Sequence, residues 1–391
     1  MDRRTALRVG VAVGVGASGG CLSRLREEAG VDDADGETSR IARVEDPPDA
    51  VYVPSHRETM ERLEPARAGD YAVAPMVTYA HPFWLVDGSE TTLVEPQGGP
   101  EVHLMIALRE PETGAALPVA SGARLRLEHD GESVGSVSPW PMISQGMGAH
   151  FGDNLTLEGD GTYAVEVELP PLGVRTTGTL AGRFETFETA TFEFTYDEAF
   201  REAVADVEYL DEELWGRRGA LEPTGHGRGD GDAGNDSNAD DDRSGHEGDE
   251  RGMAQSVSAL APAEEYPGLL GAPERDDAVL VTAMLEPGSR FVDDEERYLL
   301  VSPRTPYNRV PLADMAMTAT VARGDEAVEE ADLVQTIDGE YGHHYGAGVA
   351  ELAEGDALTV AIEGVPQVAR HQGYETAFLE MEPIELTVGG A

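Results

Sequence analysis

The sequence of 391 residues predicts an all-β protein with two tandem immunoglobulin-like β-sandwich domains, a short connecting helix and an acidic linker. Three observations support this prediction. Short runs of alternating apolar and polar residues recur with Gly and Asp turn residues between them, which is typical of a β-sandwich. Residues 222–252 contain no Val, Ile, Leu, Met, Phe, Trp or Tyr, so they divide the chain into two halves. The two halves also share a repeated motif, which indicates a duplication.

Residues 1–21 have the features of a twin-arginine lipoprotein signal. Two adjacent arginines precede a weakly apolar, glycine-rich run, as in signals that export folded proteins. Cys21 directly follows small residues and resembles the cysteine of a lipobox, which predicts lipidation at this position. The alternative is a cleaved signal in which Cys21 has no role. We expect residues 22–48 to be a tether, and the mature protein to lie on the extracellular face of the cell membrane, held by the lipid anchor only.

The first β-sandwich is predicted over residues 70–198. Its expected strands are 71–79, 102–108, 124–128, 163–169 and 191–196. Ahead of this domain, the segment from Ser55 to Glu58 has a capping-box pattern, which predicts a short helix through Leu63. After it, apolar residues at helical spacing predict an amphipathic helix over residues 199–216.

The linker, residues 222–252, is rich in Asp, Gly, Asn and Ser, and this composition is typical of a flexible, self-repelling segment. Its aspartates suit calcium chemically, but their spacing fits no calcium loop, so a solvated linker is favoured. The second β-sandwich is predicted over residues 276–389. Its expected strands are 278–284, 297–301, 315–321, 358–363 and 377–388.

The repeat consists of a His-aromatic-Gly motif and the strand that follows it. His150-Phe-Gly in the first half aligns with His344-Tyr-Gly in the second, and Gly-Asp precedes the next strand in both. We therefore expect a duplicated sandwich in which each motif forms a turn before an equivalent strand.

Charge is the most extreme feature of the composition. The chain has 75 acidic and 28 basic residues and a net charge of -47, and it contains no lysine. Such a surface repels nucleic acid and anionic lipid headgroups, which excludes a nucleic-acid-binding protein. Because molar salt screens this repulsion, the composition predicts an extreme halophile. With one cysteine, neither an internal disulfide nor an all-cysteine metal site is available.

Soft metal ligands occur on one predicted strand and in the segment after it. The two-residue period of the strand 102–108 places His103 and Met105 on the face opposite its aliphatic residues. Met142 and His150 follow in the same half. Imidazole and thioether ligands suit Cu(I), and also Cu(II) or Fe(II) when histidines dominate. Each residue also has a structural alternative, with the methionines filling a core and the histidines shaping a strand or a turn.

These same motifs resemble the periplasmic ferrous-iron transport protein family, the copper- and iron-binding accessory proteins of bacterial iron uptake. That family has a Pro-Met pair shortly before His-Tyr-Gly-Ala-Asn, after a strand that carries His-x-Glu. The resemblance implies that His103, Met142 and His150 are metal ligands in this chain. Met105 replaces the expected glutamate, which favours copper over a harder metal.

In the second half the resemblance is partial. His344 matches the motif, and His371 falls where the family has a late histidine, but no Pro-Met pair precedes His344. The first half lacks a late histidine. The resemblance implies a dimer with metal sites near the subunit contact. We therefore expect an intrachain pseudo-dimer, or a homodimer, in which His371 completes the site of His103, Met142 and His150.

Together these features predict a cell-surface lipoprotein that binds copper, iron or both as an accessory to iron transport. Its expected partner is a metal permease or a redox protein of the membrane. Because no catalytic triad or two-histidine zinc helix is present, we do not expect an enzyme. The alternative is a metal-free tandem β-sandwich that serves cell-surface interaction or envelope structure.

Overall fold

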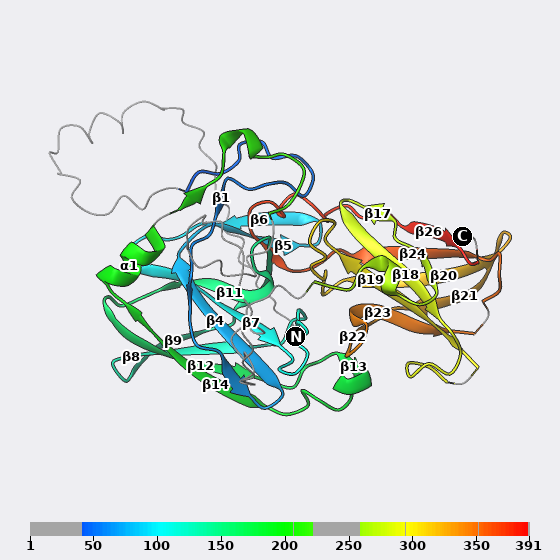
Figure 1. Ribbon diagram of the computed structural model, residues 1–391, viewed down its shortest axis with the longest axis horizontal. Helices are drawn as coiled ribbons and strands as arrows, with labels where there is room; N and C mark the ends of the chain where they lie inside the picture. The colour runs from blue at the N-terminus through cyan, green and yellow to red at the C-terminus, as the bar shows by residue number, and fades with distance from the viewer. Residues whose placement is uncertain (1–40, 206, 222–258, 294, 351, 390–391) are drawn as a thin grey trace, which may run out of the picture. The chain divides into compact units, whose positions relative to one another are not determined.

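A computed structural model describes residues 41–205, 207–221, 259–293, 295–350 and 352–389. The predicted export signal with Cys21, most of the tether and the acidic linker lie outside the described residues. The described part consists almost entirely of strands, which pack as two β-sandwiches, so the predicted fold class is confirmed (Figure 1). Within this part of the chain no helix has the length and apolarity that a membrane span requires.

The first sandwich packs a nine-stranded sheet against a four-stranded sheet. The larger sheet consists of β2 (Glu61–Arg62), β3 (Ala66–Ala68), β4 (Tyr71–Tyr79), β5 (Phe83–Asp87), β6 (Glu90–Val94), β7 (Glu101–Arg109), β10 (Trp140–Ser144), β11 (Gly148–Thr156) and β25 (Ala369–Arg370). Its order is β2-β4-β7-β11-β10-β25-β5-β6, with β3 beside β4. The smaller sheet, in the order β14-β12-β8-β9, consists of β8 (Arg124–His129), β9 (Glu132–Val137), β12 (Gly161–Leu169) and β14 (Glu188–Tyr196).

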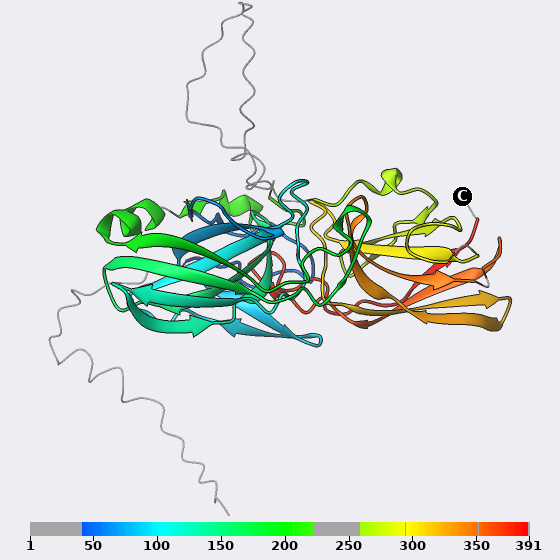
Figure 2. The ribbon, with the colours of Figure 1, turned by 90° about the horizontal axis from the view of Figure 1, so that it is seen from below.

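The second sandwich is also built from two sheets, a larger and a smaller one (Figure 2). Its seven-stranded sheet consists of β13 (Arg175–Thr177), β16 (Leu269–Gly271), β17 (Glu274–Arg275), β18 (Ala278–Leu285), β19 (Arg297–Arg304), β22 (Val334–Asp338) and β23 (Gly342–Val349). The order is β13-β22-β23-β19-β18-β16, with β17 beside β18. Its four-stranded sheet, in the order β21-β20-β24-β26, consists of β20 (Ala316–Arg323), β21 (Glu326–Asp332), β24 (Ala357–Gly364) and β26 (Ile384–Thr387).

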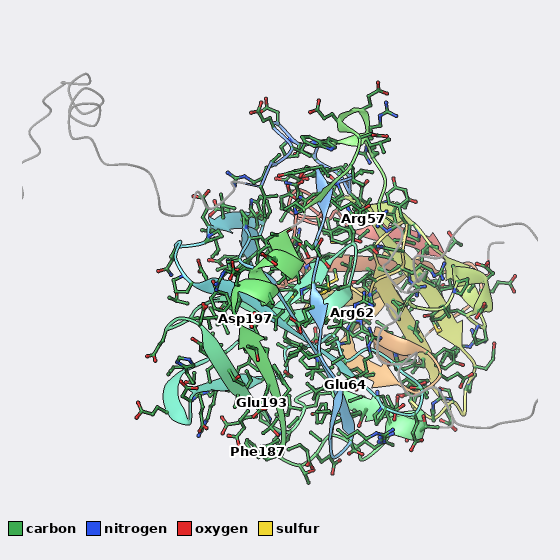
Figure 3. The ribbon with its side chains drawn as sticks, turned by 60° about the vertical axis from the view of Figure 1, so that its left-hand side comes forward. Arg57, Arg62, Glu64, Phe187, Glu193 and Asp197 are labelled. Carbon is green, nitrogen blue, oxygen red and sulfur yellow. The ribbon has the colours of Figure 1, made fainter. Side chains whose placement is uncertain are left out.

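A hydrophobic core fills the space between the two sheets of each sandwich. In the first, Leu104 of the larger sheet and Val165 and Phe192 of the smaller sheet belong to one buried cluster. The intervening residues of β14 face solvent, and Glu193 projects outward from that layer (Figure 3). The two-residue period therefore gives β14 an apolar inner face and a polar outer face of threonine and glutamate.

The two halves exchange one short strand each. β25, from the second half of the chain, pairs in parallel with β10 of the first sandwich and aligns Ala369 with Met142. β13, from the first half, pairs in parallel with β22 of the second sandwich and aligns Arg175 with Thr336. Because Met142 pairs with His150 and Thr336 pairs with His344, the two exchanges are equivalent. Each larger sheet is therefore completed by the other half of the chain.

The connecting helix is shorter than the predicted span of 199–216. The α-helix α1 covers Glu198–Ala205, and the chain then forms the strand β15 (Glu208–Tyr209) and a 3-10 turn. β15 pairs with the strand β1 (His56–Arg57). Leu214 is exposed, so the second part of the helical pattern has no core to pack against. Short 3-10 turns occur at Gly178–Leu180, Glu212–Leu214 and Ala263–Glu265.

Three further expectations of local structure are wrong. The segment after Ser55 forms β1 and β2 rather than a capped helix, because the Ser55 hydroxyl donates a hydrogen bond to Ala42 instead of capping a helix. The motifs at His150 and His344 lie within strands, since both are paired on two sides. The last strand covers only Ile384–Thr387, because the segment between β25 and this strand forms turns.

Candidate metal centre

The outer face of the nine-stranded sheet carries the predicted ligands of the first half. On β7, His103 and Met105 lie opposite the core residues Val102 and Leu104, as the alternation predicts. Asn154 of β11 is the cross-strand partner of His103, and His150 lies four residues before Asn154 on the same face. The register of two neighbouring strands therefore places His103 and His150 on one surface.

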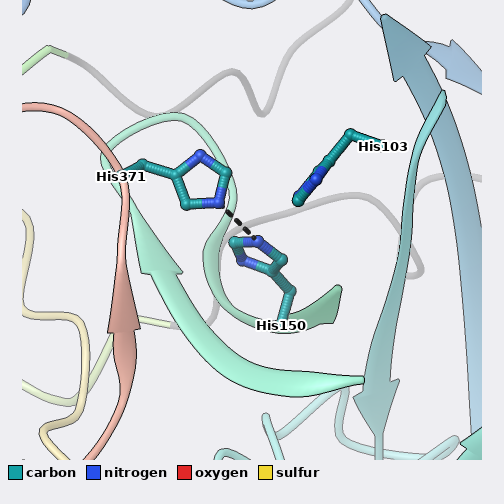
Figure 4. Close-up of side chains that lie close together, drawn as sticks. All are labelled: His103, His150 and His371. Atoms are coloured by element: carbon teal, nitrogen blue, oxygen red, sulfur yellow. Dashed lines mark hydrogen bonds between the residues drawn. The ribbon is translucent and has the colours of Figure 1, made fainter. Parts of the chain in front are cut away.

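His371 reaches this face from the second half of the chain through β25. Its backbone N–H donates a hydrogen bond to the carbonyl of Ile143 in β10, at 3.1 Å. One ring nitrogen of each of His103, His150 and His371 lies within 4.8 Å of the others, and all three residues are buried. Figure 4 shows the three rings around a common point. The structure therefore brings together three of the histidines that the sequence singled out.

Hydrogen bonds fix which nitrogen of each ring faces the centre. The Nδ1 of His150 lies 3.0 Å from the carbonyl oxygen of Gly148, and the Nδ1 of His371 lies 2.8 Å from a carboxylate oxygen of Glu58. These oxygens only accept, so each Nδ1 carries a proton, and in the neutral form of each ring Nε2 carries a lone pair. The two Nε2 atoms face each other at 3.3 Å. A shared proton or a cation is required between two such acceptors.

His103 is oriented by Asn154. The Nδ1 of His103 lies 2.9 Å from the Oδ1 of Asn154, while the amide nitrogen of Asn154 donates to the carbonyl of His81 at 2.9 Å. That second bond fixes the amide orientation, so the Nδ1 of His103 is the donor and its Nε2 is a lone pair. The Nε2 is buried and has no hydrogen-bond partner. The Nε2 of His103 is thus an acceptor without a partner that faces two other imidazoles. Such a nitrogen is available to bind a metal ion.

Burial keeps the imidazoles of His103 and His150 neutral. It lowers the pKa of His150 to about 3 and holds the pKa of His103 well below its usual range, and the nearby histidines add to both effects. Metal ions bind the neutral form of imidazole. The rings are therefore in the ligand form at neutral pH without any proton loss from His103 or His150.

The glycine of the His-aromatic-Gly motif provides room for the His103 ring. A Cβ atom on Gly152 would lie 3.0 Å from the Nε2 of His103 and 3.2 Å from the carbonyl oxygen of Leu104. Such contacts are closer than side chains tolerate without displacement. Glycine at this position therefore lets the His103 nitrogen lie directly over the β11 backbone.

Both predicted methionines lie on the same face of the nine-stranded sheet as the histidines. Met142 is level with His150, whereas Met105 lies further along β7 from His103. Met142 is buried, is the cross-strand partner of His150, and packs with Phe83 and Ala369. Met105 is also buried and lies opposite Gly152, two residues along β7 from His103. Met142 is thus adjacent to His150 and to the strand that carries His371, which makes it the thioether best placed to join them.

Sequence reasoning missed two residues of this region, Glu58 and His81. With His371 they form a second group whose ligand atoms lie within 4.8 Å of one another. The signal for His81 was its position just after β4, the strand beside β7. Glu58 gave no signal, because its capping-box pattern suggested a helix and it lies far from the other ligands in sequence.

His344 occupies the equivalent place in the second sandwich and has different neighbours. Its Nδ1 lies 3.0 Å from the carbonyl oxygen of Gly342, as in His150. Tyr298 is the cross-strand partner of Gly348 and so stands where His103 stands in the first sandwich. Its hydroxyl lies 3.2 Å from the Nε2 of His344, and Phe291 packs against both rings. Among the described residues, no group of metal-binding side chains includes His344.

Comparison with known proteins gives one family and several chains of solved structures, among them two of FetP. Residues 264–387 match a family described as a domain of unknown function, DUF7350. No curated protein sequence matches the chain. A copper-bound variant of FetP from uropathogenic Escherichia coli strain F11 is 22% identical, over 35% of this chain and 97% of that chain, with a TM-score of 0.27. As-isolated FetP of the same strain is 19% identical over 35% and 95%, with a TM-score of 0.26. Scores this low assign no residue and no activity to this chain.

Proposed function

We propose that this protein binds copper or ferrous iron at His103, His150 and His371, with Met142 as a fourth ligand, and acts as a cell-surface accessory to metal transport. The observation that carries the proposal is the 3.3 Å separation of the inward-facing Nε2 atoms of His150 and His371. Two nitrogens that bind one tetrahedral ion at about 2.0–2.1 Å lie roughly 3.3 Å apart. The separation supports a shared ion at this point.

The ligand types favour copper(I) at this centre. Three imidazoles and one thioether form a donor set without a negative charge, and a soft monovalent ion suits such a set. Where the resembling family has a hard glutamate ligand, this chain has Met105. The His150 motif and the Pro-Met pair resemble those of the periplasmic iron-transport accessory proteins. This resemblance supports a similar accessory role for this protein.

The surroundings of the centre favour capture of a cargo ion. Burial lowers the pKa of His103 and His150, so binding does not require proton removal from either ring. The acidic surface raises the local concentration of cations, although molar salt weakens this effect. A lipid anchor at Cys21 holds the protein on the outer face of the membrane, where a permease or a redox protein receives the ion.

Elemental analysis of protein purified in molar salt tests this proposal. We expect about one copper per chain in the wild type after loading and dialysis, and much less in a His103→Ala/His150→Ala double variant. His344→Ala is the matched control, because it removes an equally buried histidine from the equivalent strand of the other sandwich. Equal, sub-stoichiometric copper in the wild type and the double variant would favour the metal-free alternative.

A further inference from the structure

Glu58 is a half-buried acidic residue that lies beside two histidines. It lies between β1 and β2, and its side chain is 17% exposed. One carboxylate oxygen lies 2.8 Å from the Nδ1 of His371 and 3.7 Å from the Nε2 of His81. Both of its ion pairs are therefore with histidines rather than with an arginine. A carboxylate in such surroundings requires a positive charge nearby.

His81 presents a free lone pair to the same point. Its Nδ1 lies 3.2 Å from the carbonyl oxygen of Pro82, which only accepts, so the proton is on Nδ1. Its Nε2 is buried and has no hydrogen-bond partner. The ring centre of His81 lies 4.9 Å from that of His371 and 4.2 Å from that of His103. The Nε2 of His81 is a second orphaned acceptor, and it faces a carboxylate oxygen rather than a donor.

We propose that Glu58, His81 and the Nδ1 of His371 form a second cation site, beside the centre of His103 and His150, that takes ferrous iron. Two imidazoles and one carboxylate are the donor set that suits non-haem Fe(II), whereas Cu(I) prefers the uncharged set of the first centre. Ligand atoms of the three residues lie within 4.8 Å of one another, which is the spacing that one ion can bridge. The inference rests on the proposed function only through His371, which both sites share.

The two sites use opposite nitrogens of the His371 ring. Nε2 faces His150, and Nδ1 faces Glu58. An Fe²⁺ ion that binds Nδ1 displaces the proton now donated to Glu58, and that proton passes to solvent. When both sites are filled, His371 therefore bridges the two ions as an imidazolate. A surface pocket lined by His56, Glu58 and His371, among others, gives the second site access from outside. Two ligands of the second site, Glu58 and His371, line this pocket, whereas of the three histidines of the first centre only His371 does.

Anaerobic titration with Fe²⁺ in molar salt, followed by equilibrium dialysis and elemental analysis, tests the second site. The wild type loaded with one Cu(I) should bind one Fe²⁺ per chain. His81→Gln should weaken Fe²⁺ binding at least tenfold while copper stoichiometry stays at one. Glu58→Gln should weaken Fe²⁺ binding as much, and it should also lower copper affinity, because Glu58 orients His371. Glu61→Gln is the matched control, because it removes the same charge from an exposed position three residues away.

The His103→Ala/His150→Ala variant separates the two proposals. It lacks the first centre but keeps all three ligands of the second, so it should still bind one Fe²⁺ per chain. If it loses Fe²⁺ together with copper, iron occupies the first centre and the second site is refuted. Fe²⁺ binding that is equal in the wild type, Glu58→Gln and Glu61→Gln refutes the second site as well. Neither result removes the copper centre, whose own test is the copper content.

Discussion

Substitution of His371 by Ala removes one ligand that comes from the other half of the chain. The backbone hydrogen bond from His371 to Ile143 stays, so β25 keeps its place. Zinc-finger peptides bind Zn²⁺ through four ligands with about 10–16 kcal/mol, or about 3 kcal/mol per ligand, and we take this scale for the copper centre. At 1.4 kcal/mol for each factor of ten, we expect roughly 100-fold weaker copper binding in His371→Ala.

Competition with a chromophoric Cu(I) chelator in molar salt measures this change. His344→Ala is the control, because it deletes an imidazole from the equivalent strand of the second sandwich and should leave copper affinity unchanged. Thermal unfolding of both copper-free variants shows whether either is destabilised. A His371→Ala protein that is folded and binds copper as tightly as the wild type would refute a centre shared between the two halves.

Three further predictions concern the surroundings of the ligands. Asn154→Leu removes the hydrogen bond that orients His103 and should weaken copper binding by about 10–100-fold in the same competition assay, while unchanged affinity would exclude this role. Gly152→Ala forces a Cβ against the His103 ring and should cost about 1–3 kcal/mol of unfolding free energy, measured by denaturant titration. Burial lowers the pKa of His343, which lies outside the metal centre, to about 3, so the unfolded chain takes up its proton first as pH falls below about 6.5. The free energy of unfolding therefore falls as pH decreases from about 6.5 towards 3. Between pH 7 and pH 5 this fall should be about 2 kcal/mol smaller in His343→Gln than in the wild type. An equal fall in both proteins would contradict burial of His343 in its neutral form.

The fold class was accessible from the sequence because the inner strands alternate regularly. β4 and β12 match their predicted ranges within two residues, since each buries one face in a core. The helix over 199–216 was overestimated because its period continues past Ala205 into residues that pair with β1 instead. The exchanged strands β13 and β25 are too short to show any periodicity, so tertiary pairing alone defines them.

The site was accessible only in part. Strand alternation predicts the face of His103, and the family resemblance indicates Met142, His150 and His371. Glu58 and His81 could not be found in this way, because their proximity to His371 depends on how the N-terminal segment packs over β25. For His344, the motif shared by the two halves does not show that Tyr298 stands where the first half has His103.

Copper K-edge X-ray absorption of the Cu(I)-loaded protein tests the central claim most directly. We predict scattering from three imidazole rings and one sulfur atom, with the sulfur contribution lost in Met142→Leu and one imidazole lost in His371→Ala. A spectrum without imidazole scattering, or one that both substitutions leave unchanged, would contradict a copper centre formed by His103, Met142, His150 and His371.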